Sequence, residues 1–358
     1  MIISDCYKTS KFDEVFENTD AKIELAKVSE KDQKWDFIRN ETVNLTDNLR
    51  RTDLQNYAER MSKCSLYLHM KPDDERGFKL VNTQFCHFRH CPVCTARKAW
   101  VMGQRVKEFY DSIKNNYPTH HLLFLTLTAP NPKIQDLRNA LKAMNKAWDR
   151  FSKRKWFKEL VVGFIRFTEV TRDEKRPNTH AHPHFHIMLL VKPSYFGKSY
   201  IKQAEWQERW QDAMRSDLCL VDVRKVKANP KKAHQSGKKG DISGVVAELA
   251  KYPNKSNDLL GNGRQGFKTT ENGINLVKDD VLAWTVEYIK QVKSLKFQAT
   301  GGVFAKALKK PEEITDKEMI FGAEIKEDDV QDDRRVVFSF IRADRRYLHM
   351  SSYFVQRE

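Results

Sequence analysis

Two apolar runs stand out in the pattern of hydrophobic and polar positions along the chain. The first spans residues 121–130 and ends in a Pro-Asn-Pro sequence, and the second spans residues 187–191. Near-continuous apolar runs of this length are typical of strands buried on both faces. Residues 161–171 carry a third strand pattern, and residues 221–226 alternate as a half-buried strand.

Helical patterns lie between and around these strands. They cover residues 95–110, 134–160, 201–216 and 243–252, and the first part of residues 281–308. Residues 35–54 show weaker helical periodicity. We expect a turn at residues 300–302 and a surface linker in the acid-rich residues 311–333, whereas residues 334–353 have strand character and could join a sheet.

Four histidines recur at every second position in the segment HAHPHFH, residues 180–186, directly before the second apolar run. Because side chains alternate faces along a strand, His184 and His186 point to the same side. Two adjacent imidazoles at a strand start are a ready site for a metal ion. The alternative is a loop cluster with one hydrogen-bonded core histidine, which the period of two argues against.

A carboxylate completes this predicted metal site. If residues 161–171 pair with the histidine strand through a turn centred near Pro177, Glu169 lies roughly opposite His186. A carboxylate among core-facing residues needs a partner. The sequence therefore predicts Glu169 as the third ligand.

Residues 57–100 hold four of the six cysteines, namely Cys64, Cys86, Cys91 and Cys94. A predicted β-hairpin over residues 67–81 would bring the first of them near the second, and the last two form a CxxC motif. Four thiolates so placed suit one tetrahedral zinc ion. The alternatives are separately buried, reduced thiols, or replacement of one cysteine ligand by His69, His87 or His90.

The charge of the chain indicates the kind of partner that it binds. The 358 residues carry 64 Lys+Arg against 48 Asp+Glu, which gives a net charge of +16. A protein this basic most often meets nucleic acid, although some basic proteins are merely soluble. The basic loop between Lys225 and Lys239 could be a solvated surface loop, but beside a metal site in a basic protein contact with phosphate fits it at least as well. With neither a signal pattern nor an apolar run of the ~20 residues that a membrane helix needs, we expect a cytoplasmic protein that makes no membrane contact.

In the predicted helix 243–252, Glu248 and Tyr252 lie four residues apart and share a face. The proline at position 253 is expected to end or kink the helix there. By itself, the pattern favours Glu248 as a surface carboxylate paired with Lys251 or Lys255.

Five motifs occur in an order that resembles the HUH endonuclease superfamily, and more narrowly the rolling-circle replication initiator (Rep) proteins of small bacterial plasmids. The motifs are FCHFRHCPVC at 85–94, FLTLT at 124–128, HFH at 184–186, ELAKY at 248–252 and LKFQATGGVF at 295–304. The resemblance covers about residues 57–308.

The resemblance implies an α+β fold, in which a central antiparallel sheet with flanking helices follows a small cysteine-rich zinc-binding module. The strands near 122–128 and 184–191 would lie side by side at the centre of the sheet. The implied segments are an N-terminal extension (1–55), the cysteine-rich module (56–100), the HUH nicking endonuclease domain (101–308), and an acidic linker with a C-terminal extension (309–358).

The resemblance also implies an activity, namely sequence-specific, metal-dependent DNA nicking and closing. His184, His186 and Glu169 would hold Mg²⁺ or Mn²⁺, and His182 could also touch the metal. Tyr252 would be the nucleophile that forms a 5′-phosphotyrosine. Glu248 would activate water for a later cut. Lys251, Lys255 or the field of the metal could stabilise the phenolate, and both lysines would contact the DNA.

The implied partners are origin DNA, single- and double-stranded, and a host helicase and polymerase. One alternative within the superfamily is a single-tyrosine transposase or a conjugative relaxase. An alternative from another class is a zinc-containing DNA-binding regulator without catalysis. The histidine strand and Glu169 argue against the regulator, because DNA binding alone does not require them.

Overall fold

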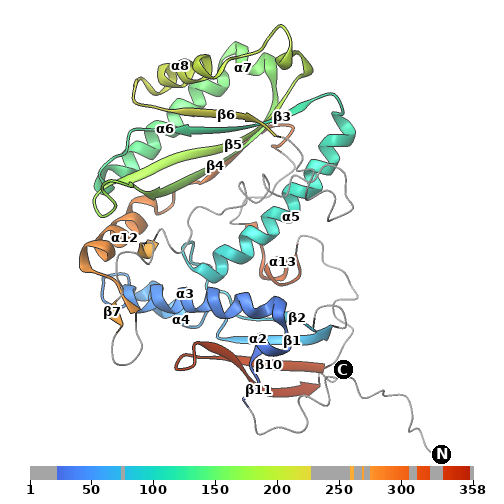
Figure 1. Cartoon of the computed structure of the whole chain (residues 1–358), viewed down its shortest axis with the longest axis vertical. Coiled ribbons are helices and arrows are strands. Elements are labelled where there is room, and N and C mark those ends of the chain that lie inside the picture. Colours follow the sequence, from blue (N-terminus) through green and yellow to red (C-terminus); the bar gives the residue numbers. More distant parts are fainter. Residues whose placement is uncertain are drawn as a thin grey trace, which may run out of the picture.

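A computed structural model of the chain describes residues 22–73, 77–226, 259–261, 268–269, 275–305, 313–322 and 334–354. Two larger antiparallel sheets occupy opposite ends of the molecule, and the long helix α5 (Pro92–Asn116) runs between them (Figure 1). Helices flank both sheets. The predicted α+β class with antiparallel sheets is therefore confirmed.

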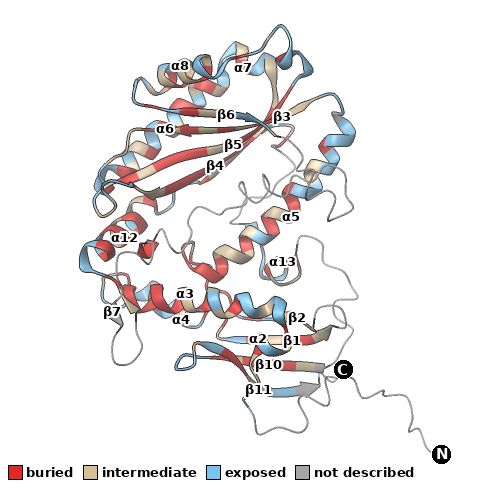
Figure 2. Ribbon diagram, in the orientation of Figure 1, coloured by how far each residue is buried: buried red, intermediate tan, exposed pale blue. Residues whose placement is uncertain are grey.

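The larger sheet has five strands, and every neighbouring pair is antiparallel. Its strands in spatial order are β6 (Val221–Lys225), β3 (His121–Thr128), β5 (Ala181–Val191), β4 (Val161–Arg172) and β9 (Gln298–Gly302). The strand that carries the histidines, β5, is thus central, with β3 beside it as expected. Buried residues fill the central strands (Figure 2).

Helices α6, α7 and α8 pack beside this sheet (Figure 1). Their bounds are Leu137–Lys153, Lys155–Leu160 and Gln203–Met214. Trp148 of α6 contacts Phe164 of β4, and Trp210 of α8 contacts Phe185 of β5. Since Phe164 and Phe185 lie on the helix side, alternation places the neighbouring strand positions, including His184, on the opposite face.

The smaller sheet joins distant parts of the chain. Its strands in order are β11 (Arg346–Phe354), β10 (Arg334–Ile341), β1 (Tyr67–Asp73) and β2 (Gly77–Asn82). The predicted hairpin over residues 67–81 and the strand character of residues 334–353 are both confirmed. The C-terminal hairpin pairs with the hairpin that lies between Cys64 and Cys86, so two hairpins far apart in the sequence share one sheet.

The remaining elements are shorter or connect the two sheets. They are α2 (Leu25–Val28), η1 (Glu30–Asp32), α3 (Gln33–Leu49), α4 (Gln55–Ser62), η2 (Ile134–Asp136), η3 (Pro193–Phe196), β7 (Lys268–Thr269), β8 (Asn275–Leu276), α12 (Asp279–Val292) and α13 (Asp316–Phe321). Within the described residues, no helix is long and apolar enough to span a membrane.

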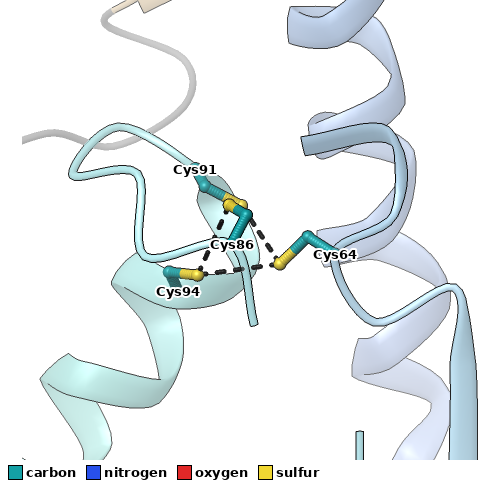
Figure 3. Close-up of side chains that lie close together, drawn as sticks. All are labelled: Cys64, Cys86, Cys91 and Cys94. Atoms are coloured by element: carbon teal, nitrogen blue, oxygen red, sulfur yellow. Dashed lines mark hydrogen bonds between the residues drawn. The ribbon is translucent and has the colours of Figure 1, made fainter. Parts of the chain in front are cut away.

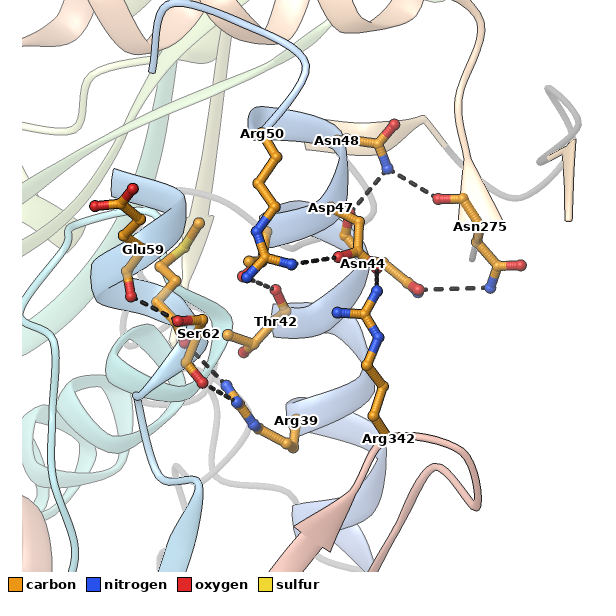
Figure 4. A network of polar contacts seen from close by, with 12 residues as sticks. Arg39, Thr42, Asn44, Asp47, Asn48, Arg50, Glu59, Ser62, Asn275 and Arg342 are labelled. Carbon is orange, nitrogen blue, oxygen red and sulfur yellow. Dashed lines mark hydrogen bonds and ion pairs between the residues drawn. The ribbon is translucent and has the colours of Figure 1, made fainter. Parts of the chain in front are cut away.

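Helix α3 is tied to its neighbours by buried polar contacts (Figure 4). The guanidinium of Arg39 donates to backbone carbonyls at the end of α4, 2.5 and 3.0 Å away. The amide of Asn48 donates to the carbonyl of Asn275 at 2.9 Å, and Asp47 accepts from Arg342 of the C-terminal hairpin at 2.6 Å. Helix α3 is therefore part of the folded body.

Several expectations from the sequence need correction. Residues 300–302, expected to form a turn, belong to strand β9 and pair with β4. The glycines that suggested a turn allow close approach instead, because a side chain at Gly302 would collide with the carbonyl of Val162. Within the acid-rich residues expected to be a surface linker, α13 buries Met319, and it also buries Glu318 against Arg105 of α5.

The predicted helix over residues 134–160 is also divided into η2, α6 and α7. The predicted helix over residues 243–252, with Glu248, Lys251 and Tyr252, lies outside the described residues. Lys255 and most of the predicted basic loop after Lys225 do so as well.

Candidate metal centres

Strands β4 and β5 bring together the three predicted ligands of the first centre. Glu169 on β4 pairs directly with His184 on β5, and Phe167 pairs with His186. The predicted register, with Glu169 opposite His186, was therefore wrong by two residues. A shift of two keeps every side chain on its face, so the three groups still converge.

The turn between these strands explains the register. The carboxylate of Asp173 accepts from the backbone N–H groups of Lys175 and Arg176, at 3.0 and 2.6 Å. This contact fixes a turn directly after β4 and places Ala181 opposite Arg172.

A single carboxylate oxygen lies at the centre of the cluster. Oε2 of Glu169 lies 3.0 Å from Nε2 of His184 and 2.8 Å from Nε2 of His186. Glu169 and His184 are buried, and His186 is half-buried. The three potential ligand atoms lie within 4.8 Å of one another. An ion bound there would take the place of the shared imidazole protons.

The second ring nitrogen, Nδ1, of His184 and of His186 also has a polar contact. Nδ1 of His184 lies 3.2 Å from the carbonyl oxygen of His182, and Nδ1 of His186 lies 3.4 Å from Oγ1 of Thr126. The His186 ring also stacks on Phe124, with centroids 5.5 Å apart. Contacts of this kind orient metal-binding histidines and leave Nε2 free to bind.

The charge of Glu169 suits a cation. Burial disfavours the ionised carboxylate, but the hydrogen bonds from His184 and His186 outweigh this effect and hold its pKa well below the usual range. The cluster therefore presents a carboxylate that favours its ionised form, together with two imidazole nitrogens, at one point of a basic protein.

His182 lies beside the cluster but is not one of its three converging groups. Its ring centroid is 5.1 Å from that of His184. Its Nδ1 is 2.7 Å from Oδ1 of Asn131, whose amide nitrogen donates to Asp173. The sequence did not single out Asn131 or Thr126. The Pro-Asn-Pro sequence was interpreted only as a strand end, although it places Asn131 beside the start of β5.

Four cysteine sulfurs form the second centre (Figure 3). Cys64 follows α4, Cys86 follows β2, and Cys91 and Cys94 lie at the start of α5. All four are buried and none forms a disulfide. The sulfur of Cys64 is 3.6 Å from those of Cys91 and Cys94, and Cys86 is 3.7 Å from Cys94.

These distances fit one tetrahedral ion. Metal–sulfur bonds of about 2.3 Å place the sulfurs of a tetrahedral site about 3.8 Å apart. Hydrogen bonds from the other three thiols lower the pKa of Cys86, whereas burial raises the pKa of Cys91. Four thiolates could not be ionised together in this buried space without a cation to neutralise them.

The three histidines considered as substitutes are engaged elsewhere. His87 pairs with Asp316 at 2.7 Å, His90 packs against the rings of Phe88 and Tyr288, and His69 lies in strand β1. Among the described residues, the cysteines alone make up this ligand set.

Comparison with known proteins gives the family. The sequence model of the replication protein (Rep) family matches residues 77–348, well over half of the chain. The chain belongs to the Rep family. This membership confirms the resemblance to the plasmid rolling-circle replication initiators that the motifs predicted.

Named relatives cover about two thirds of the chain. A Rep protein of Bacillus amyloliquefaciens is 36% identical over 237 residues, which are 63% of this chain and 67% of the relative. A Rep protein of Streptococcus pneumoniae is 29% identical over 249 residues, which are 68% of this chain and 74% of the relative. No solved structure matches the chain.

The Rep family match spans both centres except for Cys64, which lies before residue 77. The strands of the five-stranded sheet lie within residues 121–302. The other predicted site residues, Glu248, Lys251, Tyr252 and Lys255, fall within the family match but outside the described residues.

Proposed function

We propose that this Rep protein is a sequence-specific DNA nicking-closing enzyme that initiates rolling-circle replication of a plasmid. The observation that carries the proposal is the convergence of Glu169, His184 and His186 on one face of the central sheet. The net charge of +16 supports DNA as the substrate.

The catalytic ion in this proposal is Mg²⁺ or Mn²⁺, held by Glu169, His184 and His186. A bound divalent ion would act as a Lewis acid that withdraws charge from the scissile phosphate. Three protein ligands leave coordination positions for phosphate oxygens, and the face of the sheet opposite α6 and α8 carries all three. The proposed nicking domain, residues 101–308, includes the whole five-stranded sheet.

Tyr252 is the nucleophile in this proposal. Its phenolate oxygen attacks phosphorus, the P–O3′ bond breaks, and the leaving oxygen takes up a proton to become the 3′-OH that primes synthesis. The energy of the phosphodiester is kept in a 5′-phosphotyrosine, so the reverse reaction closes the strand. A free phenol has a pKa of about 10, and Lys251 and Lys255 would stabilise its ionised form.

The second centre is proposed to hold structural zinc through Cys64, Cys86, Cys91 and Cys94. The sulfur spacing supports this choice, because closed four-sulfur sites are typical of structural zinc. The site would fix α4, β2 and the start of α5 to one another. It lies in the proposed module 56–100, whose sheet is completed by β10 and β11.

The proposed partners are single- and double-stranded origin DNA with a host helicase and polymerase, in the cytoplasm. A transposase or relaxase of the same superfamily would use the same metal cluster, whereas a non-catalytic zinc-containing regulator would not need it. A nicking assay on supercoiled plasmid with Mn²⁺ distinguishes the regulator from the enzymes. Only an enzyme relaxes the plasmid and leaves protein covalently attached to it.

The decisive experiment compares Tyr252→Phe with Glu248→Ala in that assay. Tyr252→Phe should lose the covalent adduct entirely. Glu248→Ala should still form the adduct, because the phenol remains, but should fail to terminate and should accumulate products longer than one plasmid unit. An adduct in Tyr252→Phe would exclude Tyr252 as the nucleophile. Normal termination in Glu248→Ala would make Glu248 a surface residue of its helix.

A further inference from the structure

Two leucines in the segment directly before the edge strand β6 are exposed to solvent. Leu218 is 76% exposed and Leu220 is 61% exposed, whereas Cys219 and Val221 between and after them are buried. An apolar run that leads into a strand on both faces is typical of a segment that is covered on both sides. Here one side is buried against the core, and the other side is open.

The backbone that presents these leucines is firmly held. The side-chain amide of Gln211 donates to the carbonyl oxygens of Asp217 and Cys219, at 2.8 and 3.2 Å. The N–H of Thr128 donates to the carbonyl of Leu220 at 3.0 Å, and the N–H of Leu220 donates to Oγ1 of Thr128 at 2.9 Å. The leucines are therefore displayed on a fixed surface and do not sit on a loose loop.

Leu220 lies in the same row of the sheet as the candidate catalytic centre. Val221 pairs with Leu127, which places Leu220 opposite Thr128. Thr128 in turn pairs with His184, and His184 pairs with Glu169. Paired residues share a face of the sheet, and the burial of Cys219 and Val221 on the core side agrees with this placement.

The distance suits a short stretch of DNA. Neighbouring strands lie about 4.8 Å apart, so Leu220 is on the order of 10 Å from His184 along this row. Stacked nucleotides advance by about 3.4 Å along one strand, so this distance corresponds to a few nucleotides. Next along the same face, the carboxylate of Asp222 is paired with Arg224 at 2.8 Å, which reduces its repulsion of a phosphate backbone.

We propose that Leu218 and Leu220 form a base-contact surface for the unpaired nucleobases of the DNA strand whose phosphate lies at the Glu169–His184–His186 centre. This inference rests on the proposed nicking function. A strand to be cut is single there, so its bases lack pairing partners and can be turned out of the stack. Proteins insert leucine and other apolar side chains against unstacked bases, and the contact removes both surfaces from water.

The test compares nicking kinetics of the full-length Leu218→Ser/Leu220→Ser variant with those of the wild-type protein on a single-stranded origin oligonucleotide with Mn²⁺. The KM should rise about tenfold, because loss of two partly buried leucine contacts weakens binding. The kcat should not change, since neither side chain touches the reacting atoms. Leu218→Met/Leu220→Met should restore the wild-type KM. Met350→Ser is the matched control, since Met350 is 62% exposed on the other sheet, and it should change nothing.

A second measurement uses the same oligonucleotide with 2-aminopurine at successive positions on both sides of the cut. Binding of the wild-type protein should change the fluorescence at one or two positions a few nucleotides from the cut, and the serine variant should lose that change. An unaltered KM in the serine variant, or a uniform fluorescence response, would overturn the inference. An unaltered KM together with a change from dimer to monomer in sedimentation would assign the leucines to a second copy of the chain instead. Failure of the wild-type protein to nick would count against the proposed function itself.

Discussion

The two ligand clusters of this chain differ in how many ligands they bring and in what surrounds them. The cysteine cluster supplies four sulfurs, all buried, from three separate segments of the chain. The Glu169–His184–His186 cluster supplies three ligands from two neighbouring strands, and one of them is half-buried. A closed set of four ligands is suited to holding segments together, while a set of three leaves room for a substrate.

The hydrogen bonds around the two clusters also differ. Around the cysteines, hydrogen bonds hold the backbone. For example, the guanidinium of Arg60 donates to the carbonyl of Cys86 at 2.6 Å. Around the histidines, the contacts reach the second ring nitrogen and set how each ligand is turned. The difference suggests that loss of the first cluster damages folding and loss of the second damages chemistry.

The largest expected effect is on stability, from loss of zinc at the cysteine cluster. Structural zinc contributes on the order of 10 kcal/mol of apparent binding free energy in small modules, because the site does not exist in the unfolded chain. Cys91→Ser should therefore lose zinc, about one ion per chain in the wild-type protein, and should unfold at a clearly lower temperature. Elemental analysis and a thermal melt measure both quantities.

The control for this variant is Cys219→Ser, which changes a buried thiol outside both clusters. It should keep its zinc. Retention of zinc and of the wild-type melting temperature in Cys91→Ser would remove the cysteine cluster from the account of stability.

The next effect is on the reaction, from loss of the two imidazoles. His184→Ala/His186→Ala should reduce cleavage of single-stranded origin DNA by at least about 100-fold, since the ligands that place the charge-neutralising ion are gone. Binding of duplex origin DNA should stay close to that of the wild-type protein. Nicking and filter-binding assays give the two values, and cleavage at the wild-type rate would exclude this cluster from the mechanism.

The sequence predicted both clusters because each depends on local spacing. Two histidines two residues apart on a strand share a face wherever that strand lies, and a CxxC motif at a helix start sets two sulfurs side by side. Contacts between distant segments were harder to foresee. Strand β10 pairs with β1 across more than 250 residues, and nothing in either strand's own pattern names its partner.

The remaining misses have local physical causes. Gly301 and Gly302 have the composition of a turn, yet their lack of side chains is what lets β9 approach β4 closely. The exact register of β4 on β5 depends on the side chain of Asp173 within the turn, which hydrophobic patterning does not report. Thr126 and Asn131 support the histidines from another strand and from the segment after it, so only the folded sheet shows their role.

A smaller effect is expected from the supports of the histidines. Thr126→Val keeps the shape of the side chain but removes the oxygen beside Nδ1 of His186. The affinity for Mn²⁺ should fall about tenfold, in line with losses of such outer contacts in metal sites. Thr168→Val is the control, because the Thr168 hydroxyl is buried without a hydrogen-bond partner in the described part of the chain. Equal Mn²⁺ affinities in the two variants would show that Thr126 does not orient the ligand.

The smallest effect is expected at His182, and it decides whether the Glu169–His184–His186 cluster gains a fourth protein ligand. Nδ1 of His182 donates to Oδ1 of Asn131 at 2.7 Å, and His182 does not converge with the other three groups. If it stays outside the coordination sphere, His182→Ala should weaken Mn²⁺ binding only a few-fold, no more than Thr126→Val. Titration calorimetry of both variants and of His184→Ala measures the difference. A loss in His182→Ala as large as that in His184→Ala would make His182 a fourth ligand, and the two clusters would then no longer differ in ligand number, only in burial and chemistry.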